Sequence, residues 1–303
     1  MATAVLKKWG EPEKLAWLAS QTIQRSYQDE VVVKIEALKA NFDVVQYGAL
    51  SYDAERYPVF AVKSRGWDAA KRTVLVTGGV HGYETIGVQG ALRFLETSAL
   101  SYADKFNVVV TPCISPWGYE TINRWNNNAV DPNRSFFGGG GSEEATLLRS
   151  FVASLGSFIV HIDLHETTHT DLSVFGPEKA SRDAQVFEAE NIPDAFYLVA
   201  DSLAPTPHFQ KAVLDAVERV THIAEASMTH GVAQLIGTPI SQRGVVNYPT
   251  AQLGCCIGFT GADFSTATEV CPSDKSPPEK CLLAQVAAVT GALDFTKGRS
   301  DAL

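Results

Sequence analysis

The 303-residue sequence contains no long hydrophobic run and few cysteines. Residues 1–8 hold no apolar stretch behind their lysines, so we expect neither a signal peptide nor a transmembrane span. The cysteines number five, and their spacing fits neither a disulfide framework nor a zinc knot. Reduced thiols and a cytoplasmic location are therefore expected.

Positive charge is also scarce, because 25 Lys and Arg residues stand against 34 Asp and Glu residues, for a net charge of −9. This balance argues against binding to nucleic acid or to an anionic membrane surface. The sequence shows no internal repeat, no low-complexity linker and no break in composition. With 45% hydrophobic residues it can build a sizeable core, and residues 1–303 are expected to form a single domain.

The spacing of hydrophobic residues predicts strands that alternate with helices. Strands are expected at 42–50 and 57–63, as a hairpin, and at 73–78, 106–112, 158–164, 255–259 and 264–270. Helices are expected within 11–40 and at 84–97, from 142 through the apolar residues near 151, at 208–229 and at 279–294. This alternation predicts an α/β sheet that helices cover on both faces.

One turn carries the first chemical signal. An apolar run at 74–76 ends in two glycines, and His81 and Glu84 follow before an amphipathic stretch begins. This order predicts a strand, a tight turn and the start of a helix. Imidazole and carboxylate groups are both zinc ligands, and such a turn can direct both at one point.

A second histidine motif lies at 165–169, where His165, Glu166 and His169 spell H-E-x-x-H. Glu188 even occupies the place of the downstream glutamate ligand of some zincins. That motif binds zinc only on a helix, whereas the preceding residues and the neighbouring threonines favour a strand. We therefore expect His165 alone to act, at the carboxyl end of its strand, where ligands gather in an α/β sheet.

A long irregular segment at 115–142 is rich in Asn, Pro, Gly and Trp, and loops of this length are usually functional. It contains Arg124, Asp131, Asn133 and Arg134. Arginine and asparagine near a metal suit a substrate that carries a carboxylate. The alternative is that Arg134 pairs with Asp131 and only holds the loop together.

Glu269 lies at the end of the strand predicted at 264–270. A carboxylate there could take a proton from metal-activated water and pass it to a leaving amine. The alternative is a solvated or ion-paired glutamate with no catalytic role.

In their order, these segments resemble the zinc carboxypeptidase family (the funnelins), which has an H-x-x-E turn, an N-P-x-G…R…N-R loop, a strand-end His and a late catalytic Glu. The matching residues over about 73–270 are 81–84, 115–118, Arg124, 131–134, His165 and Glu269. Residues 142–146 also resemble the family's S-E-x-E-T helix start, with Ala145 in place of an acid.

The resemblance implies a mixed, twisted, roughly eight-stranded sheet with helices on both faces. It also implies that His81, Glu84 and His165 bind one catalytic Zn²⁺, and that Asp131 accepts the other ring N–H of His81 and so fixes its tautomer.

For the substrate, the resemblance implies that Arg124 polarises the scissile carbonyl and that Asn133 and Arg134 hold a terminal carboxylate. Glu269 would be the general base and then the acid. The family's mobile tyrosine has no clear counterpart, although Tyr248 follows a segment that resembles its surroundings, so the preferred side chain of the substrate stays open. The lack of a pro-domain resembles the cytosolic bacterial branch of the family, which is related to the succinylglutamate desuccinylase and aspartoacylase group.

Three functions remain open on the sequence. The first is a metallocarboxypeptidase that removes a C-terminal residue from a peptide. The second is a zinc amidohydrolase that deacylates an N-acyl amino acid, as aspartoacylase and succinylglutamate desuccinylase do. The short stretch after the last predicted helix leaves no room for the extra β domain of some such relatives, which favours the peptidase. The third is a binding module without activity. The expected partner is a peptide or acylated amino acid with a free carboxylate.

Overall fold

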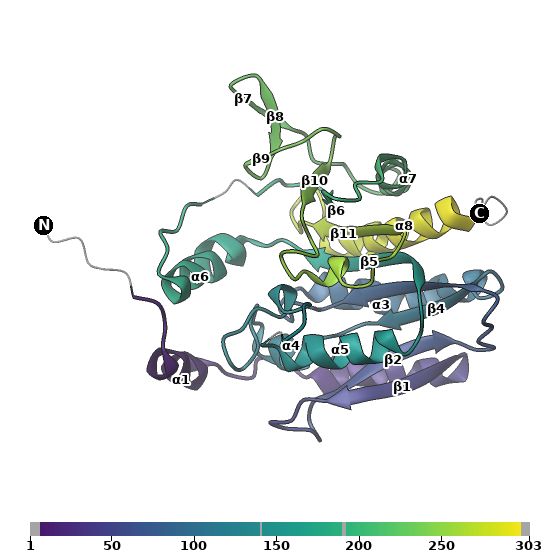
Figure 1. Ribbon diagram of the computed structural model, residues 1–303, viewed down its shortest axis with the longest axis horizontal. Coiled ribbons are helices and arrows are strands. Elements are labelled where there is room, and N and C mark those ends of the chain that lie inside the picture. The colour runs from purple at the N-terminus through teal and green to yellow at the C-terminus, as the bar shows by residue number, and fades with distance from the viewer. Residues whose placement is uncertain (1–6, 140, 190–191, 298–303) are drawn as a thin grey trace, which may run out of the picture.

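A computed structural model describes residues 7–139, 141–189 and 192–297. Its centre is a mixed eight-stranded sheet with the strand order β1-β2-β4-β3-β5-β11-β6-β10 (Figure 1). The strands are β1 (Phe42–Ala49), β2 (Pro58–Ser64), β3 (Arg72–Gly78), β4 (Phe106–Thr111), β5 (Phe158–Glu166), β6 (Tyr197–Asp201), β10 (Val245–Tyr248) and β11 (Phe264–Val270). The predicted eight-stranded α/β fold is confirmed.

The middle of the sheet is parallel and largely buried. Strands β4, β3, β5 and β11 run in one direction, so their carboxyl ends meet at one edge of the sheet. The hairpin β1–β2 joins β4 in antiparallel fashion, and β6 pairs antiparallel with β11 on the other side. The ends of β3, β5 and β11 therefore lie side by side, as a shared ligand site requires.

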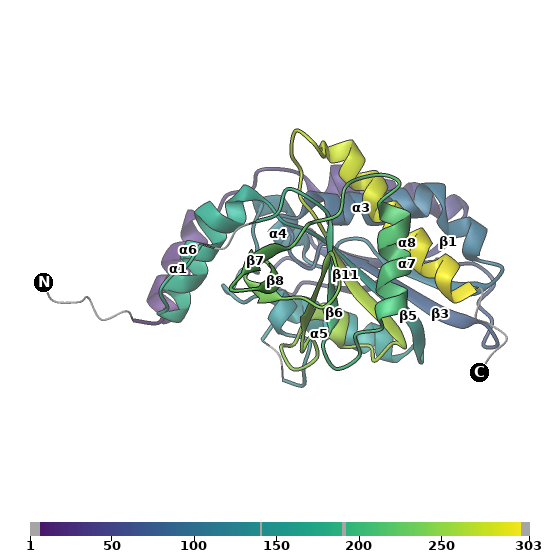
Figure 2. The same ribbon diagram turned by 90° about the horizontal axis from the view of Figure 1, so that it is seen from above.

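Helices cover both faces of the sheet, as Figures 1 and 2 show. Helices α3 (Thr85–Thr97), α7 (Pro207–Val217) and α8 (Pro278–Lys297) pack on one face around the largest hydrophobic cluster. Helix α5 (Glu143–Ala153) packs on the opposite face against β3, β4 and β5. Ser142 caps its first turn by accepting a hydrogen bond from the amide of Ala145, as the sequence predicts.

Two further parts flank the sheet. Helices α1 (Glu11–Ser20) and α6 (Gly176–Asp183) lie together at one end of the molecule, where the amide of Trp9 donates to the carbonyl of Arg182 (Figures 1 and 2). A small sheet projects beyond β10, the last strand of the large sheet (Figure 1). Its strands are β7 (Ser227–Thr229), β8 (Val232–Leu235) and β9 (Thr238–Pro239).

Three predicted elements are wrong or incomplete. Residues 255–259 form not a strand but a 3₁₀ turn at Cys256–Gly258, because the chain folds back there against the loop at Asn133. The helix expected at 208–229 ends at Val217. The helix expected within 11–40 breaks after Ser20, and the chain resumes as the helical turns Gln28–Val32, Val33–Ala37 and Leu38–Ala40.

The irregular segment at 115–142 does hold one short helix, α4 (Pro116–Thr121), and a 3₁₀ turn at Pro132–Arg134. A π-helical turn at Asp171–Phe175 leads into α6. Among the described residues, none of the helices is long and apolar enough to cross a bilayer.

Candidate metal centre

The turn after β3 directs His81 and Glu84 to one point. Gly79 turns the chain with a φ of +63°, a conformation that residues with a side chain adopt at a cost. Gly82 packs so closely on α4 that an added Cβ would lie 2.0 Å from the carbonyl carbon of Gly118. Glu84 is then the residue that precedes α3. The two glycines thus set the path that brings the imidazole and the carboxylate together.

Arg25 holds this turn from outside. Its guanidinium donates to the carbonyl of Gly82 at 2.9 Å, to Thr85 Oγ1 at 2.5 Å and to the carbonyl of Tyr119 at 2.6 Å. The same group stacks on the ring of Tyr119. Because one planar cation binds both sides of Glu84, it restrains the turn and the helix start at once.

His165 comes from the end of β5, next to β3. Leu164 is the register partner of Gly78, so His165 lies beside the turn that begins there. The buried side chain of Gln285, on α8, donates to the carbonyl of His165 at 2.8 Å and accepts from Thr268 on β11 at 2.5 Å. This amide ties the ends of the two strands together.

The three predicted ligands converge. Glu84 Oε1 lies 2.7 Å from His81 Nδ1, and Glu84 Oε2 lies 2.8 Å from His165 Nδ1. All three side chains are buried, and their ligand atoms lie within 4.8 Å of one another. Burial opposes ionisation, but His165 and His81 hold the pKa of Glu84 well below its ordinary range. The carboxylate is therefore charged and ready to bind a cation.

Each imidazole is oriented by a further carboxylate. His81 Nε2 lies 3.0 Å from Asp131 Oδ1, and His165 Nε2 lies 2.7 Å from Asp163 Oδ2. With the ring proton on Nε2, the Nδ1 lone pair of each ring faces Glu84, as metal binding requires. Three buried carboxylates around two imidazoles also concentrate negative charge, which a divalent cation would neutralise. The residues fit a metal with two nitrogen ligands and one oxygen ligand, a set that zinc accepts.

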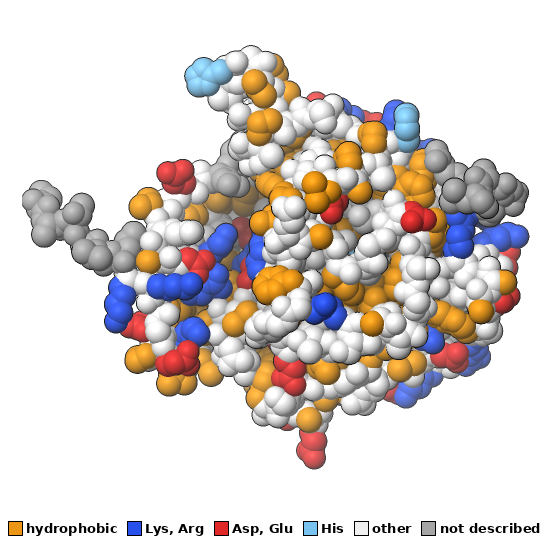
Figure 3. Space-filling model, viewed as in Figure 1, with side chains coloured by type: hydrophobic (Ala, Val, Ile, Leu, Met, Phe, Trp, Pro, Cys, Tyr) orange, Lys and Arg blue, Asp and Glu red, His pale blue; other side chains and the backbone are white. Residues whose placement is uncertain are grey.

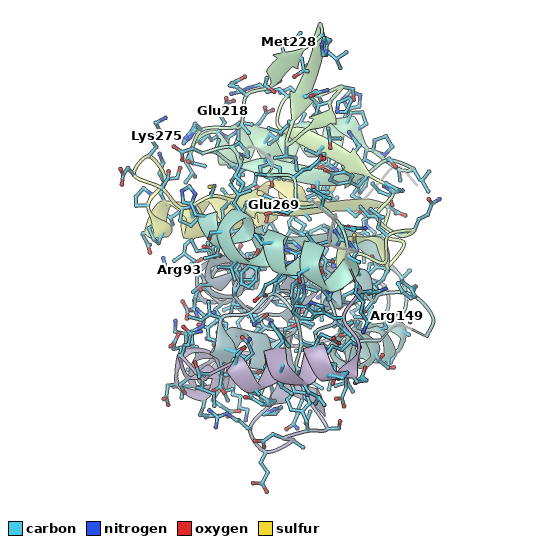
Figure 4. The ribbon with its side chains drawn as sticks, turned by 90° about the vertical axis from the view of Figure 1, so that its left-hand side faces the viewer. Arg93, Arg149, Glu218, Met228, Glu269 and Lys275 are labelled. Atoms are coloured by element: carbon cyan, nitrogen blue, oxygen red, sulfur yellow. The ribbon has the colours of Figure 1, made fainter. Side chains whose placement is uncertain are left out.

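Glu269 stands one strand away from His165. Glu269 on β11 and His165 on β5 are register partners. On its other side, Glu269 pairs with Tyr197 on β6. Thr167 Oγ1 donates to Glu269 Oε2 at 2.7 Å. Burial raises the pKa of Glu269 to about 7, although His165 opposes the shift. In Figure 4, which looks from the side of α1 and α6, the label of Glu269 stands above the front helix.

The long loop supplies the guanidinium groups. Arg124 donates to Asp131 Oδ2 from Nε at 3.3 Å and from Nη2 at 3.2 Å, and its Nη1 lies 3.8 Å from Asp171 Oδ1. The structure therefore pairs Asp131 with Arg124, and the alternative in which Arg134 pairs with Asp131 is wrong. Burial opposes the charge of Asp131, but Arg124 and then His81 keep its pKa well below the ordinary range.

Asn133 and Arg134 lie in the 3₁₀ turn of the loop, close to His165. Asn133 Oδ1 accepts from the amide of Cys256 at 2.7 Å, and its Nδ2 lies 3.5 Å from His165 Nε2. Arg134 donates from Nη1 to the carbonyl of Asn133 at 2.7 Å and approaches Cys255 Sγ at 3.5 Å. In the part of the chain that the structure describes, no carboxylate lies within ion-pair distance of Arg134.

All of these groups line one cleft with a cavity of about 420 Å³. The three metal ligands, Glu269, Arg124, Asn133, Arg134 and Tyr248 border it. The hydroxyl of Tyr248 forms a hydrogen bond with Thr238 Oγ1 at 2.9 Å, which connects β10 to the small sheet. The cleft thus holds every predicted site residue except Asp131, which lies behind it.

The H-E-x-x-H motif does not form a zincin helix. His165 and Glu166 are in β5, while His169 is exposed and lies outside the cluster of ligands. Glu188 is exposed and borders a neighbouring cavity. The prediction that this motif contributes one candidate ligand and not two agrees with the geometry.

Sequence reasoning missed three residues of the site. Asp163 carried a usable signal, because residues two apart on a strand share a face, so Asp163 had to lie beside His165. Tyr197 is on β6, a short strand that was not predicted. Arg25 contacts residues 57 to 94 positions away and gives no local signal.

Comparisons with known proteins agree with this picture. Residues 35–151 match the family model of the zinc carboxypeptidases, so the resemblance to that family is confirmed in sequence for this segment. No curated protein matches the chain. The matched segment includes His81, Glu84 and the loop arginines, whereas His165 and Glu269 lie beyond it.

Solved structures extend the likeness to the whole fold. A protein of Shewanella amazonensis SB2B, provisionally named a metallopeptidase, is 21% identical with a TM-score of 0.61, over 87% of this chain and 90% of its own. The metallo-carboxypeptidase from Burkholderia cenocepacia is 14% identical with a TM-score of 0.62, over 89% and 69%. Bovine thrombin-activatable fibrinolysis inhibitor is 13% identical with a TM-score of 0.57, over 98% and 100%. At these identities, the likeness shows that the fold is shared.

Proposed function

We propose that this chain, whose sequence and fold resemble the zinc carboxypeptidases, is a zinc-dependent hydrolase that removes the C-terminal residue of a peptide. The observation that carries the proposal is the placement of Glu269 beside His165, in the cleft where His81 and Glu84 converge. A base with a pKa near neutrality next to a metal-ligand set is the arrangement that metal-assisted hydrolysis requires.

His81, Glu84 and His165 would hold one Zn²⁺. When bound, the ion would act as a Lewis acid that makes a water more acidic and a carbonyl more electrophilic. Asp131 and Asp163 keep the ring protons on Nε2, so that both Nδ1 atoms stay available.

Glu269 moves the proton. Its carboxylate takes a proton from the attacking water and, because burial raises its pKa to about 7, holds it long enough to deliver it to the nitrogen of the leaving amine. Thr167 orients the carboxylate through Oε2 and leaves Oε1 for the water.

Arg124 and Arg134 would bind on either side of the terminal residue, at the carbonyl of the cleaved bond and at the terminal carboxylate. Arg124 borders the cleft, and Asp131 holds its guanidinium in place to donate to the developing oxyanion. Arg134 has no carboxylate partner among the described residues, so its fork can take the terminal carboxylate of the substrate, with Asn133 Nδ2 as a second donor. Tyr248 borders the same cleft.

The terminal side chain is apolar in this proposal. The wall of the cleft beyond Arg134 carries no charged group among its described lining residues, which are Val199, Tyr248, Thr250, Leu253, Cys255, Ile257 and Ala267. Four of them form one hydrophobic cluster: Val199, Cys255, Ile257 and Ala267. A charged terminal side chain would lose its hydration there without a partner, so an aliphatic or aromatic side chain is expected.

The test is the release of the last residue from peptides that end in Phe or Leu, compared with peptides that end in Lys or Asp. We expect release in the zinc-loaded protein, a preference for the apolar ends, and loss of activity in Glu269→Gln and after chelation. Activity that survives either treatment would exclude this mechanism. Faster turnover of N-acetyl amino acids than of peptides would instead favour the amidohydrolase alternative, and metal binding without any turnover would favour a binding module.

A further inference from the structure

A second cavity, of about 400 Å³, adjoins the metal cleft. The segment between β5 and β6 builds most of it, through the turn at Asp171–Phe175, helix α6 and the residues that follow. Both cavities share Arg124, Thr167, Asp171, Lys179, Tyr197 and Ile236. The two spaces are therefore continuous.

The shared residues fix the direction of a bound substrate. The metal ligands and Arg134 border only the metal cleft, whereas Arg124 borders both cavities. If Arg124 meets the carbonyl oxygen of the scissile bond and Arg134 meets the terminal carboxylate, the rest of the substrate must extend past Arg124. The second cavity then receives the acyl side of the scissile bond, which is the residue before the terminal one.

Lys179 contributes an ammonium group to the lining of this cavity. It projects from α6 into the mouth of both cavities, and no carboxylate of the described chain lies within ion-pair distance of its ammonium group. Desolvation in the cleft, and then the guanidinium groups of Arg124 and Arg134, lower the pKa of Lys179. In Figure 3, Lys and Arg side chains, with Asp and Glu side chains among them, gather around the hollow beside α6.

The acidic groups nearby are already engaged or lie at the rim. Asp171 accepts hydrogen bonds from the hydroxyl of Tyr83 at 2.5 Å and from the amide of Thr168 at 2.8 Å, and it faces Arg124. Glu188 is exposed. The remaining wall is largely apolar, with Leu172, Phe175, Val186, Phe187 and Ile192. Such a wall suits a short apolar stem that ends in an anion.

We propose, on the basis of the function proposed above, that this second cavity is the acyl-side subsite and that Lys179 makes it select a carboxylate there. The substrate class is then a peptide whose residue before the last is acidic, or an amino acid acylated by a dicarboxylic acid. Both present a carboxylate on a short apolar stem, and both leave the terminal carboxylate for Arg134.

The test compares N-acetyl-Glu-Phe with N-acetyl-Gln-Phe, which differ only in the charge of the acyl-side residue, and adds succinyl-Phe for the second source. The wild-type protein is expected to prefer Glu over Gln in kcat/KM by about fivefold, the value that one solvent-exposed ion pair supplies. Lys179→Met should bring the ratio to about one, and Lys179→Glu should reverse it. Faster turnover of succinyl-Phe than of both peptides would identify the acylated amino acid as the source.

Lys105→Met is the matched control. Lys105 is exposed and precedes β4, at the amino end of the parallel strands and thus far from the cleft, so the ratio should not change. The same peptides are also measured by calorimetric binding to the Glu269→Gln protein, which reports selection without turnover.

A wild-type ratio of about one, or a ratio that Lys179→Met leaves unchanged, overturns the role of Lys179 but not the proposed function. If the zinc-loaded protein neither hydrolyses nor binds any of the compounds, the proposed function fails, and the subsite fails with it.

Discussion

Asp163→Asn tests how the second imidazole is kept ready for the metal. Asp163 is fully buried, accepts from Thr77 Oγ1 at 2.6 Å through Oδ1, and lies 2.7 Å from His165 Nε2 through Oδ2. Asparagine keeps the volume and one oxygen. Thr77 Oγ1 already accepts from Cys256 Sγ, so the amide oxygen stays with Thr77 and the amide hydrogens face His165.

The substitution then forces His165 into the wrong tautomer. Two N–H groups cannot pair, so the ring carries its proton on Nδ1, the atom that faces Glu84, and the metal loses that lone pair. Removal of such an orienting partner costs about 10–100-fold in metal affinity, which is about 1.4–2.7 kcal/mol. We expect the zinc dissociation constant of Asp163→Asn to rise by this factor.

The assay is competition for zinc with a chromophoric chelator, and thermal unfolding of the metal-free protein checks that the variant folds. Asp201→Asn is the matched control, because Asp201 is on β6, two strands away from β5, and accepts from Thr250 Oγ1, with no contact to an imidazole among the described residues. A folded Asp163→Asn protein that binds zinc within about threefold of the wild type would refute the tautomer argument.

Three other predictions follow from the same geometry. Glu84→Gln should weaken zinc binding by about tenfold or more, whereas His169→Asn should leave it unchanged, and equal losses in the chelator assay would contradict the ligand set. Gly82→Ala should destabilise the protein by about 1–3 kcal/mol in urea unfolding, because its Cβ would meet the backbone of Gly118 at 2.0 Å, and an unchanged midpoint would refute this contact. Burial raises the pKa of Glu269 from the ordinary 4.5 to about 7, so the folded metal-free protein binds this proton more tightly than the unfolded chain does. The stability that this proton contributes is therefore lost as pH rises from 4.5 through about 7. Glu269→Gln should therefore lose less stability than the wild type between about pH 5 and pH 8, and an identical loss would exclude the shift.

Elements with a long, regular pattern could be predicted from the sequence. Strands β3, β4, β5 and β11 and helices α3 and α8 lie where hydrophobic periodicity places them, since each buries one continuous apolar set. The short strands β6 and β10 escaped notice because four or five residues carry too little pattern. Residues 255–259 have the apolar character of a strand, but the long-range hydrogen bond from the Cys256 amide to Asn133 decides their conformation.

Site residues could be predicted where a residue type that binds metals or transfers protons stands at the end of a predicted strand. His81, Glu84, His165 and Glu269 each end or follow a predicted strand, so sheet topology brings them together. The residues that hold the site in place could not be predicted in this way. Arg25 acts from a segment that the sequence assigns to a plain helix, and its contacts exist only once that segment folds over α4. The roles of Arg124, Asn133, Arg134 and Tyr248 toward a substrate stay predictions.

His165, Glu269 and Tyr197 are register partners on the adjacent strands β5, β11 and β6, so the sheet fixes their spacing along its edge. Adjacent strands are spaced about 4.8 Å apart, so a metal ligand, the base and the pocket wall follow at fixed intervals across the strands. On the proposed function, a substrate would lie across these strands, and the distance from the cleaved bond to the wall of the cleft would be set by backbone hydrogen bonds rather than by flexible side chains. Substitutions in the pocket would then change which terminal residue is accepted, while the position of the cut relative to the metal ligands would stay the same.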